Sequence, residues 1–203
     1  MRPLNIKGHT RPISMVRYSR EGDLLFTSSQ DGAVCIWRTE NGEQLGRIKP
    51  GSAAVAAFAL SYDCDIILTA TVTEGLNVFK AKTGEHLNTI DKEFKTQRGR
   101  GIDLSFGDKE VLFLVEKEGV SYIRIFPYDQ VKSKNKEVEA AREFKAAEKG
   151  ELVIQATWGP LNKTIYCSTN KGRIFILDAL SGDQIKSEKP HFGEVLSFSF
   201  SKD

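Results

Sequence analysis

The sequence predicts an all-β fold in which four-stranded blades repeat around an axis, as in a β-propeller. A pattern of the form apolar-x-x-apolar-x-apolar recurs five times along the 203 residues. A second apolar marker follows four of these copies at a nearly constant distance. Because a period of about 40 to 45 residues is the size of one propeller blade, the spacing favours blades over other all-β arrangements.

The copies of the first pattern are separated by about one blade length. They are Ile13/Val16/Tyr18, Val55/Phe58/Leu60, Gly101/Leu104/Phe106, Val153/Ala156/Trp158 and Val195/Phe198/Phe200. The last residues of successive copies lie 42, 46, 52 and 42 positions apart. The second marker, at Trp37, Phe79, Phe126 and Leu177, follows the first by 19, 19, 20 and 19 residues. Two independent markers that keep the same spacing through four copies are difficult to explain by chance.

Within the first copy, short β-rich segments alternate with turns. Strands are expected near residues 14–18, 24–28, 33–38 and 44–49, with turns at Asp31-Gly32 and Asn41-Gly42 between the later ones. Asp-Gly and Asn-Gly favour tight hairpins because both residues tolerate a positive φ. Since each blade would stack on a neighbour at both faces, strands with apolar residues on both sides are expected.

The periodicity predicts a single propeller domain over residues 1–203, with four blades and the start of a fifth. The blades are expected at about 8–49, 50–90, 91–146 and 147–189, and the start of the next blade at 190–203. The third blade is longer because of a charged insertion, residues 129–151. We expect a solvated loop with one helical turn there; the alternative is a segment that docks a partner.

Charge balance and cysteine usage exclude several classes of protein. The 29 Lys and Arg residues nearly balance 27 Asp and Glu residues, whereas a nucleic-acid binder usually has a clustered basic excess. Cys35, Cys64 and Cys167 form no CxxC pair and indicate small apolar residues in a reducing compartment. The most apolar stretch, residues 53–60, is too short to span a bilayer. We therefore expect a cytoplasmic protein without a secretory signal.

No pattern in the sequence indicates catalysis, a cofactor or a metal site. The motifs GxSxG and HExxH and a Walker-type glycine loop are absent. His9 and His191 precede first strands at equivalent places and are expected to cap them, while His86 is expected at the surface. Three histidines placed in this way do not predict a metal centre.

Two further segments have a chemical interpretation and a simpler one. Asp63-Cys64-Asp65 pairs two acids around a thiol, but it falls at a turn, where solvated carboxylates are the expectation. Residues 97–101, with Lys92 and Lys95 before them, form a basic Gly-Arg stretch that could contact RNA weakly. An ordinary loop into the third blade is the preferred interpretation.

The first copy resembles a WD40 repeat. It contains Gly8-His9, then Asp31-Gly32, and Trp37 six residues after the aspartate. In that family, hydrogen bonds link the histidine, a strand hydroxyl, the aspartate and the tryptophan within one blade. The resemblance therefore implies a network of His9, Asp31 and Trp37, with Thr27 or Ser29 as the hydroxyl. Later copies depart from this pattern, so we expect apolar packing alone to hold most of those blades.

The opening of the chain is similar to that of the i subunit of eukaryotic translation initiation factor three. The segments that match are MRPL, IKGH, REGDLLF and NGEQLG, with weaker support from ATWGPLNKTI at residues 156–165, while residues 52–150 diverge. That family forms a seven-bladed propeller, so the resemblance implies a partial arc of seven blades. Residues 4–7 and 195–201 would then be open strand edges unless another copy covers them.

The resemblance implies a non-catalytic scaffold subunit that supports assembly of the initiation complex on the small ribosomal subunit. Implied partners are the b and g subunits of the factor, with indirect contact to the small ribosomal subunit and no membrane, cofactor or small-molecule substrate. No partner-contact residue is assigned. Two alternatives remain: a WD40 adaptor of another assembly, such as a ribosome-associated Gβ-like scaffold, and a propeller hydrolase. The hydrolase would need convergent acids or histidines around a central channel, which the sequence does not place.

Overall fold

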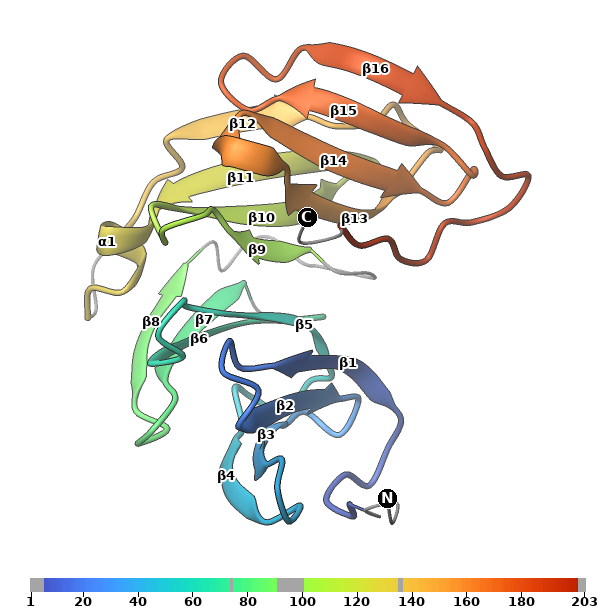
Figure 1. Ribbon diagram of the computed structural model, residues 1–203. Coiled ribbons are helices and arrows are strands. Elements are labelled where there is room, and N and C mark those ends of the chain that lie inside the picture. The colour runs from blue at the N-terminus through green and yellow to red at the C-terminus, as the bar shows by residue number, and fades with distance from the viewer. Residues whose placement is uncertain (1–5, 74, 91–100, 135–136, 201–203) are drawn as a thin grey trace.

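The computed structural model describes residues 6–73, 75–90, 101–134 and 137–200, which form four antiparallel four-stranded sheets (Figure 1). The first two sheets contain β1 (Ile13–Tyr18), β2 (Leu24–Ser29), β3 (Val34–Arg38) and β4 (Gln44–Ile48), then β5 (Val55–Leu60), β6 (Ile66–Thr71), β7 (Leu76–Lys80) and β8 (His86–Ile90). The last two contain β9 (Ile102–Leu104), β10 (Glu110–Lys117), β11 (Val120–Pro127) and β12 (Arg142–Lys145), then β13 (Val153–Trp158), β14 (Thr164–Thr169), β15 (Ile174–Asp178) and β16 (Gln184–Glu188). A short helix α1 (Tyr128–Val131) follows β11, and a 3-10 turn (Pro160–Asn162) follows β13.

Each sheet is one blade, in which consecutive strands are neighbours and the first strand lies nearest the centre (Figure 1). The inner strands β1, β5, β9 and β13 contact one another in sequence order. The prediction of an all-β propeller with repeated four-stranded blades is therefore confirmed.

Three buried apolar clusters fill the three interfaces between consecutive blades. Met15, Phe26 and Phe58 belong to the cluster between blades 1 and 2, and Leu68 and Phe113 to the cluster between blades 2 and 3. A third cluster joins blades 3 and 4. Because side chains alternate along a strand, neighbouring residues of one strand serve different interfaces. This explains why strands such as β6 and β10 are apolar on both faces.

The prediction of a partial arc of a seven-bladed propeller with the start of a fifth blade is wrong. The structure has four blades in a ring, and the described residues 189–200 contain no strand. The sequence period sets the size of a blade, but it does not set how many blades surround the axis. Of the predicted outer strand at residues 4–7, Ile6 and Lys7 have no strand conformation and the rest lies outside the described residues.

The C-terminal segment lies along blade 4 instead of starting a new blade. The Phe198 backbone N–H donates to the Gln155 side chain (3.1 Å), whose amide donates back to the Phe198 carbonyl (3.0 Å). Ser168 Oγ donates to the Val195 carbonyl (3.1 Å). The described residues of this segment form no strand, so side chains of β13 and β14, together with the Thr169 carbonyl that accepts the Val195 N–H (3.1 Å), satisfy its backbone groups in place of a sheet ladder.

The third blade differs from the sequence expectation in register. Leu104 pairs with Val111 in the way that Leu60 pairs with Ile67, so β9 ends two residues earlier than its pattern suggested. Phe106 consequently lies in the following turn with its side chain exposed. Glycine at the first place of this weakest copy removed the signal that would have fixed the register.

The insertion at 129–151 is partly structured and contributes to the core. It continues from α1 and contains the outer strand β12. Val131 and Val138 are buried in the cluster between blades 2 and 3. Within the described part of the chain, no helix is long and apolar enough to cross a membrane.

Candidate functional site

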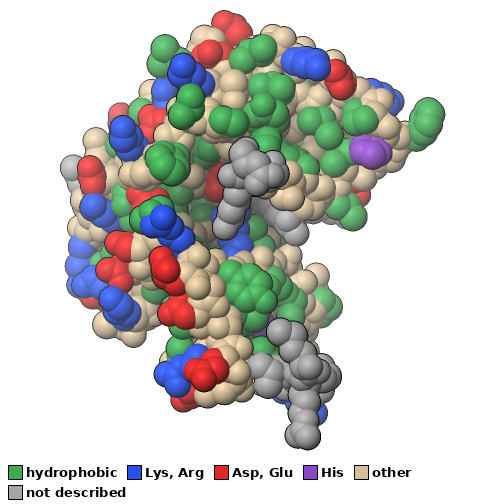
Figure 2. Space-filling model, viewed as in Figure 1, with side chains coloured by type: hydrophobic (Ala, Val, Ile, Leu, Met, Phe, Trp, Pro, Cys, Tyr) green, Lys and Arg blue, Asp and Glu red, His purple; other side chains and the backbone are tan. Residues whose placement is uncertain are grey.

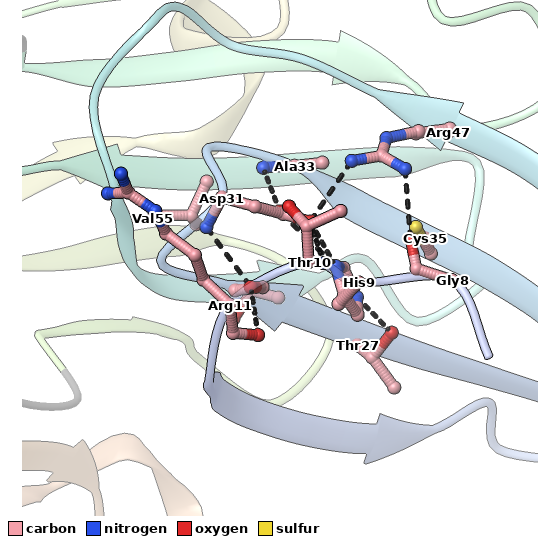
Figure 3. Close-up of polar contacts among 12 residues, drawn as sticks. Gly8, His9, Thr10, Arg11, Thr27, Asp31, Ala33, Cys35, Arg47 and Val55 are labelled. Atoms are coloured by element: carbon pink, nitrogen blue, oxygen red, sulfur yellow. Dashed lines mark hydrogen bonds and ion pairs between the residues drawn. The ribbon is translucent and has the colours of Figure 1, made fainter. Parts of the chain in front are cut away.

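The first blade contains a chain of polar contacts between buried side chains (Figure 3). Trp37 Nε1 donates to Thr27 Oγ1 (2.8 Å), Thr27 Oγ1 lies 2.8 Å from His9 Nε2, and His9 Nδ1 lies 3.1 Å from Asp31 Oδ2. With the imidazole proton on Nδ1, His9 donates to Asp31 and accepts from the Thr27 hydroxyl. Every polar atom along this chain then has a partner, as burial requires.

Asp31 is the acceptor at the end of this chain. Its carboxylate also accepts the backbone N–H groups of Thr10 and Ala33 (each 3.1 Å) and Nη2 of Arg47 (3.0 Å). Burial alone would raise the pKa of Asp31, but the hydrogen bonds from Thr10 and His9 outweigh burial and lower it. The carboxylate therefore ties the segment before β1 to the turn between β2 and β3.

The segment before β1 fits closely over this network. A Cβ atom on Gly8 would lie 2.1 Å from Cη2 of Trp37, so only glycine fits there. Arg47 Nη1 donates to the Gly8 carbonyl (2.9 Å). Ser29, the other candidate hydroxyl, donates to the Arg11 carbonyl (3.0 Å) and accepts the Asp31 backbone N–H (3.1 Å). Ser29 thus supports the Asp31 turn and does not lie between the two rings.

Blade 2 shows what happens to the hydrogen-bond network when the tryptophan is replaced by phenylalanine. Thr69 and Phe79 occupy the places that Thr27 and Trp37 occupy in blade 1. Phenylalanine has no N–H group, and Thr69 Oγ1 is buried with no hydrogen-bond partner among the described residues. This is consistent with a second blade held mainly by apolar contacts.

The other histidines do not converge. His86 is exposed and lies 2.9 Å, through Nε2, from Thr89 Oγ1, and His191 is exposed in the C-terminal segment. Over the ranges that the structure describes, no group of three or more His, Cys, Asp or Glu side chains is placed to hold a metal ion.

The turn at residues 63–65 lacks the features of a reactive thiol site. Asp63 accepts a hydrogen bond from Ser61 Oγ (2.5 Å), which lowers the pKa of Asp63. Burial raises the pKa of the Cys64 thiol, so the nucleophilic thiolate is disfavoured. Residues 91–100, which hold most of the basic Gly-Arg stretch with Lys92 and Lys95, lie outside the described residues.

A groove of about 480 Å³ lies between blades 1 and 2. Phe26, Ile36 and Ile48 form its apolar wall on blade 1, and residues 63–65 and 81–84 line it on blade 2. Lys82 and Asp65 at its edge form an ion pair (2.8 Å). The groove offers apolar surface beside charges that already neutralise each other, an arrangement suited to binding and not to chemistry.

Sequence reasoning missed a repeated contact between the turns that follow the inner strands. Asp108 Oδ2 accepts the backbone N–H of Tyr62 (2.6 Å), and Asn162 Oδ1 accepts that of Phe106 (2.7 Å). At the equivalent place between blades 1 and 2, the Arg20 backbone N–H lies near the Cys64 thiol, where it counteracts the rise of the thiol pKa caused by burial. Each acceptor lies in the turn one blade later than its donor, so three contacts connect four blades in order. We call these contacts the turn clasps.

The acceptor residues of the turn clasps share an unusual backbone conformation. Cys64, Asp108 and Asn162 have φ values of 57°, 49° and 57°, in the left-handed region where most side chains are disfavoured. Blade 1 has Gly22, with φ of 76°, at the same place. Gly22 in the sequence indicated a positive φ at this turn of blade 1. For Cys64 in blade 2, no feature of the sequence predicts a positive φ.

Several large apolar side chains remain exposed around the molecule, and Figure 2 shows hydrophobic patches among charged groups on one face. Three of them, Tyr62, Phe106 and Leu161, lie in the turns joined by the turn clasps. In this region, burial and, to a smaller extent, the negative charge of Asp63 raise the pKa of Asp108 to about 6.

A family model described as "WD domain, G-beta repeat" matches residues 2–38, which cover the first blade as far as β3. The whole chain is also similar to proteins named eukaryotic translation initiation factor 3 subunit I. Identity is 31% to the protein of Dictyostelium discoideum, 28% to that of Taeniopygia guttata and 27% to that of Homo sapiens, each over 100% of this chain. The predicted resemblance is therefore confirmed. The chain spans 59% to 61% of the length of these relatives.

Two solved structures share the fold. The Myceliophteria thermophila Cps50 (Swd1) beta-propeller domain superposes with a TM-score of 0.75 at 16% identity, covering 96% of this chain and 60% of that one. The computationally designed Ika8 protein superposes with a TM-score of 0.69 at 16% identity, covering 98% of this chain and 55% of that one. At this level of identity the likeness establishes the fold alone.

Proposed function

We propose that this chain, a WD40 propeller similar over its full length to subunit I of eukaryotic translation initiation factor 3, is a non-catalytic scaffold subunit of that factor. The observation that carries the proposal is the sequence identity of 27% to 31% to subunit I proteins over the entire chain. The proposed activity is to support assembly of the initiation complex on the small ribosomal subunit, in the cytoplasm.

The arrangement of the blades supports a scaffold role. Buried clusters between the blades and the turn clasps fix the loops relative to one another. Because the loops of a propeller are already rigid, they lose little conformational entropy when they bind a partner. We propose the b and g subunits as the direct partners, with the small ribosomal subunit contacted through them.

The His9 network belongs to the scaffold and not to its binding surface. Its side chains are largely enclosed: those of His9 and Asp31 are 5% and 4% exposed. We propose that His9, Thr27, Ser29, Asp31 and Trp37 hold the first blade together, within one propeller domain that spans the chain.

The test is reconstitution from purified components. The tagged chain is mixed with the b subunit, with the g subunit and with both, and recovery is measured by affinity capture and size-exclusion chromatography. We expect a stable complex with at least one of them, and co-sedimentation with the small ribosomal subunit only when that complex is present. Failure to bind either subunit would contradict the proposal, and recovery of signalling kinases instead would favour a Gβ-like adaptor.

A further inference from the structure

The turns that follow the inner strands of blades 2, 3 and 4 each contain an exposed apolar side chain. Tyr62 is 51% exposed, Phe106 is 78% exposed and Leu161 is 78% exposed, in blades 2, 3 and 4. In blade 1, Arg20 takes the place equivalent to Tyr62, and its guanidinium lies 4.2 Å from the centre of the Tyr62 ring. We call residues 19–23, 61–65, 105–109 and 159–163 together the turn face.

These side chains are held in place by contacts between blades. The backbone N–H groups of Tyr62 and Phe106 are both donors in turn clasps. Asn162 Nδ2 also donates to the Phe106 carbonyl (2.9 Å), so the Phe106 peptide groups are fixed on both sides. An aromatic side chain on a backbone held this firmly loses little conformational freedom when a partner binds it.

The residues of the turn face are poorly explained by folding alone. Leu161 has a φ of 57°, where glycine or asparagine is more easily accommodated, and it gains no compensating burial. Phe106 likewise buries little of its ring. Exposed aromatic and apolar side chains on rigid loops are typical of the anchors that dominate protein interfaces.

The charges of the turn face indicate what kind of partner fits. The four turns contain five carboxylates and three cations, although the whole chain has a formal net charge of +2. The carboxylates are Glu21, Asp23, Asp63, Asp65 and Asp108, and the cations are Arg20, Lys109 and Lys163. An acidic face repels the phosphates of a nucleic acid and attracts a partner rich in lysine or arginine.

We infer that the turn face binds a protein segment that places apolar or aromatic side chains next to lysine or arginine. The apolar side chains would contact Phe106 and Leu161, and the cations would lie at Asp63 and Asp108. This inference rests on the proposed scaffold role, for which it supplies a binding surface.

A peptide selection tests the inference directly. A random 12-residue display library is selected on the immobilised chain, and the enriched peptides are synthesised for fluorescence anisotropy. We expect enriched peptides to combine lysine or arginine with aromatic or branched apolar residues. The Phe106→Ser/Leu161→Ser variant should weaken their binding about tenfold or more, because it removes both proposed anchors.

Three further measurements make the result specific. Asp63→Asn/Asp108→Asn, which keeps an oxygen to accept the Tyr62 N–H, should weaken binding and reduce its dependence on salt. Phe192→Ser is the matched control, because Phe192 is fully exposed beyond the β14–β15 turn at the opposite end of blade 4. The affinity of the Phe192→Ser variant for the selected peptides should stay within about twofold of the wild-type affinity. Equal unfolding midpoints of all variants by circular dichroism exclude misfolding as the cause.

Several outcomes would overturn the inference. These are enriched peptides that bind the Phe106→Ser/Leu161→Ser variant as well as wild type, peptides without basic residues, or no enrichment. Tighter binding of a single-stranded RNA 12-mer than of any peptide, lost in the same variant, would assign the surface to nucleic acid instead.

The peptide test and the reconstitution test can fail separately. A chain that binds the b or g subunit but selects no peptide at the turn face overturns this inference alone. A chain that selects such peptides but binds neither subunit overturns the proposed function alone.

Discussion

Thr27 has the most demanding position in the first blade, because one hydroxyl serves two buried rings. It accepts from Trp37 Nε1 and donates to His9 Nε2, both at 2.8 Å. The resemblance to a WD40 repeat implied the residues of this network but not which hydroxyl lies between the rings. Thr27 and Ser29 lie on the same face of β2, so strand alternation could not separate them. Only the register of β2 against β3 decides the choice.

Replacing Thr27 tests the network at the level of one atom. Thr27→Val keeps the shape of the side chain but leaves the Trp37 N–H and His9 Nε2 without a partner. We expect the free energy of unfolding to fall by about 2–4 kcal/mol, because each unsatisfied buried polar group costs about 1–3 kcal/mol. Urea unfolding followed by circular dichroism measures the change.

Thr10→Val is the matched control for this experiment. Thr10 is exposed and contributes its backbone N–H, which valine retains. A Thr27→Val loss no larger than that of Thr10→Val would show that the hydrogen-bond chain contributes nothing to stability.

Asp31 gives the network a pH dependence. Its pKa in the folded state is lowered from the usual 3.8, so its contribution to stability is present above that value and is lost as the pH falls through the folded-state pKa. We expect Asp31→Asn to cost about 2–3 kcal/mol at pH 7, since it removes charge-assisted hydrogen bonds. The cost should shrink on acidification towards pH 3.

Urea titrations of both proteins at pH 7 and at about pH 3 measure this difference. Glu40→Gln, which changes an exposed carboxyl in the turn between β3 and β4, is the control. A cost of Asp31→Asn that is the same at both pH values would argue against the lowered pKa.

Among the elements, the turns were only partly predicted from the sequence. Glycine positions predicted where hairpins lie, because few other residues adopt a positive φ readily. The turn clasps escaped prediction, since cysteine, aspartate and asparagine share no obvious chemistry at that place. What they share is a positive φ, which Gly22 also adopts in blade 1 without such a contact, and a place that faces the preceding blade. A reading of local sequence does not include the preceding blade.

Substitutions at two glycines of blade 1 distinguish the cost of local backbone strain from the cost of a steric clash with the next blade. Gly22 and Gly32 have φ values of 76° and 79°, but a Cβ at Gly22 would meet nothing, whereas one at Gly32 would lie 2.9 Å from the Ala53 carbonyl oxygen. We expect Gly22→Ala to cost about 1–2 kcal/mol from left-handed strain alone. Gly32→Ala should cost more, because the turn must also move away from blade 2.

Thermal unfolding of the two variants by calorimetry or circular dichroism checks this order. Equal losses of stability would mean that the turn between β2 and β3 has enough freedom to relieve the contact with blade 2.

At the scale of the whole molecule, residues at equivalent positions of the inner strands β1, β9 and β13 contact one another at the centre. Asp103 on β9 accepts the Trp158 backbone N–H (3.0 Å) and a hydrogen bond from the Thr157 hydroxyl on β13. Arg17 on β1 lies 3.8 Å from the same carboxylate. One side chain thus connects blades 1, 3 and 4. The sequence period predicted blades but neither this connection nor the arrangement of four blades in a ring, because both depend on how blades pack around the axis.

Removing the Asp103 carboxylate should weaken the coupling between blades. Asp103→Ala leaves the Trp158 N–H and Thr157 hydroxyl without their acceptor, and we expect a loss of about 2–4 kcal/mol. It should also separate unfolding of the first blade from that of the other sheets.

Trp158→Phe provides a suitable background, since Trp158 Nε1 makes no hydrogen bond to the described residues and Trp37 then reports on blade 1 alone. Fluorescence and circular dichroism transitions in urea should coincide before Asp103 is replaced and differ afterwards. Transitions that still superimpose would show that apolar contacts are sufficient for cooperative unfolding.

The contrast between blade 1 and its neighbours also determines how the molecule responds to cold. Phe79, Phe126 and Leu177 stand in blades 2, 3 and 4 where blade 1 has Trp37, and none of these side chains can donate a hydrogen bond. The driving force for burying apolar groups fades as water is chilled, whereas hydrogen bonds are less affected. As the protein is cooled, the last three blades should therefore lose more of their stability than the first blade does.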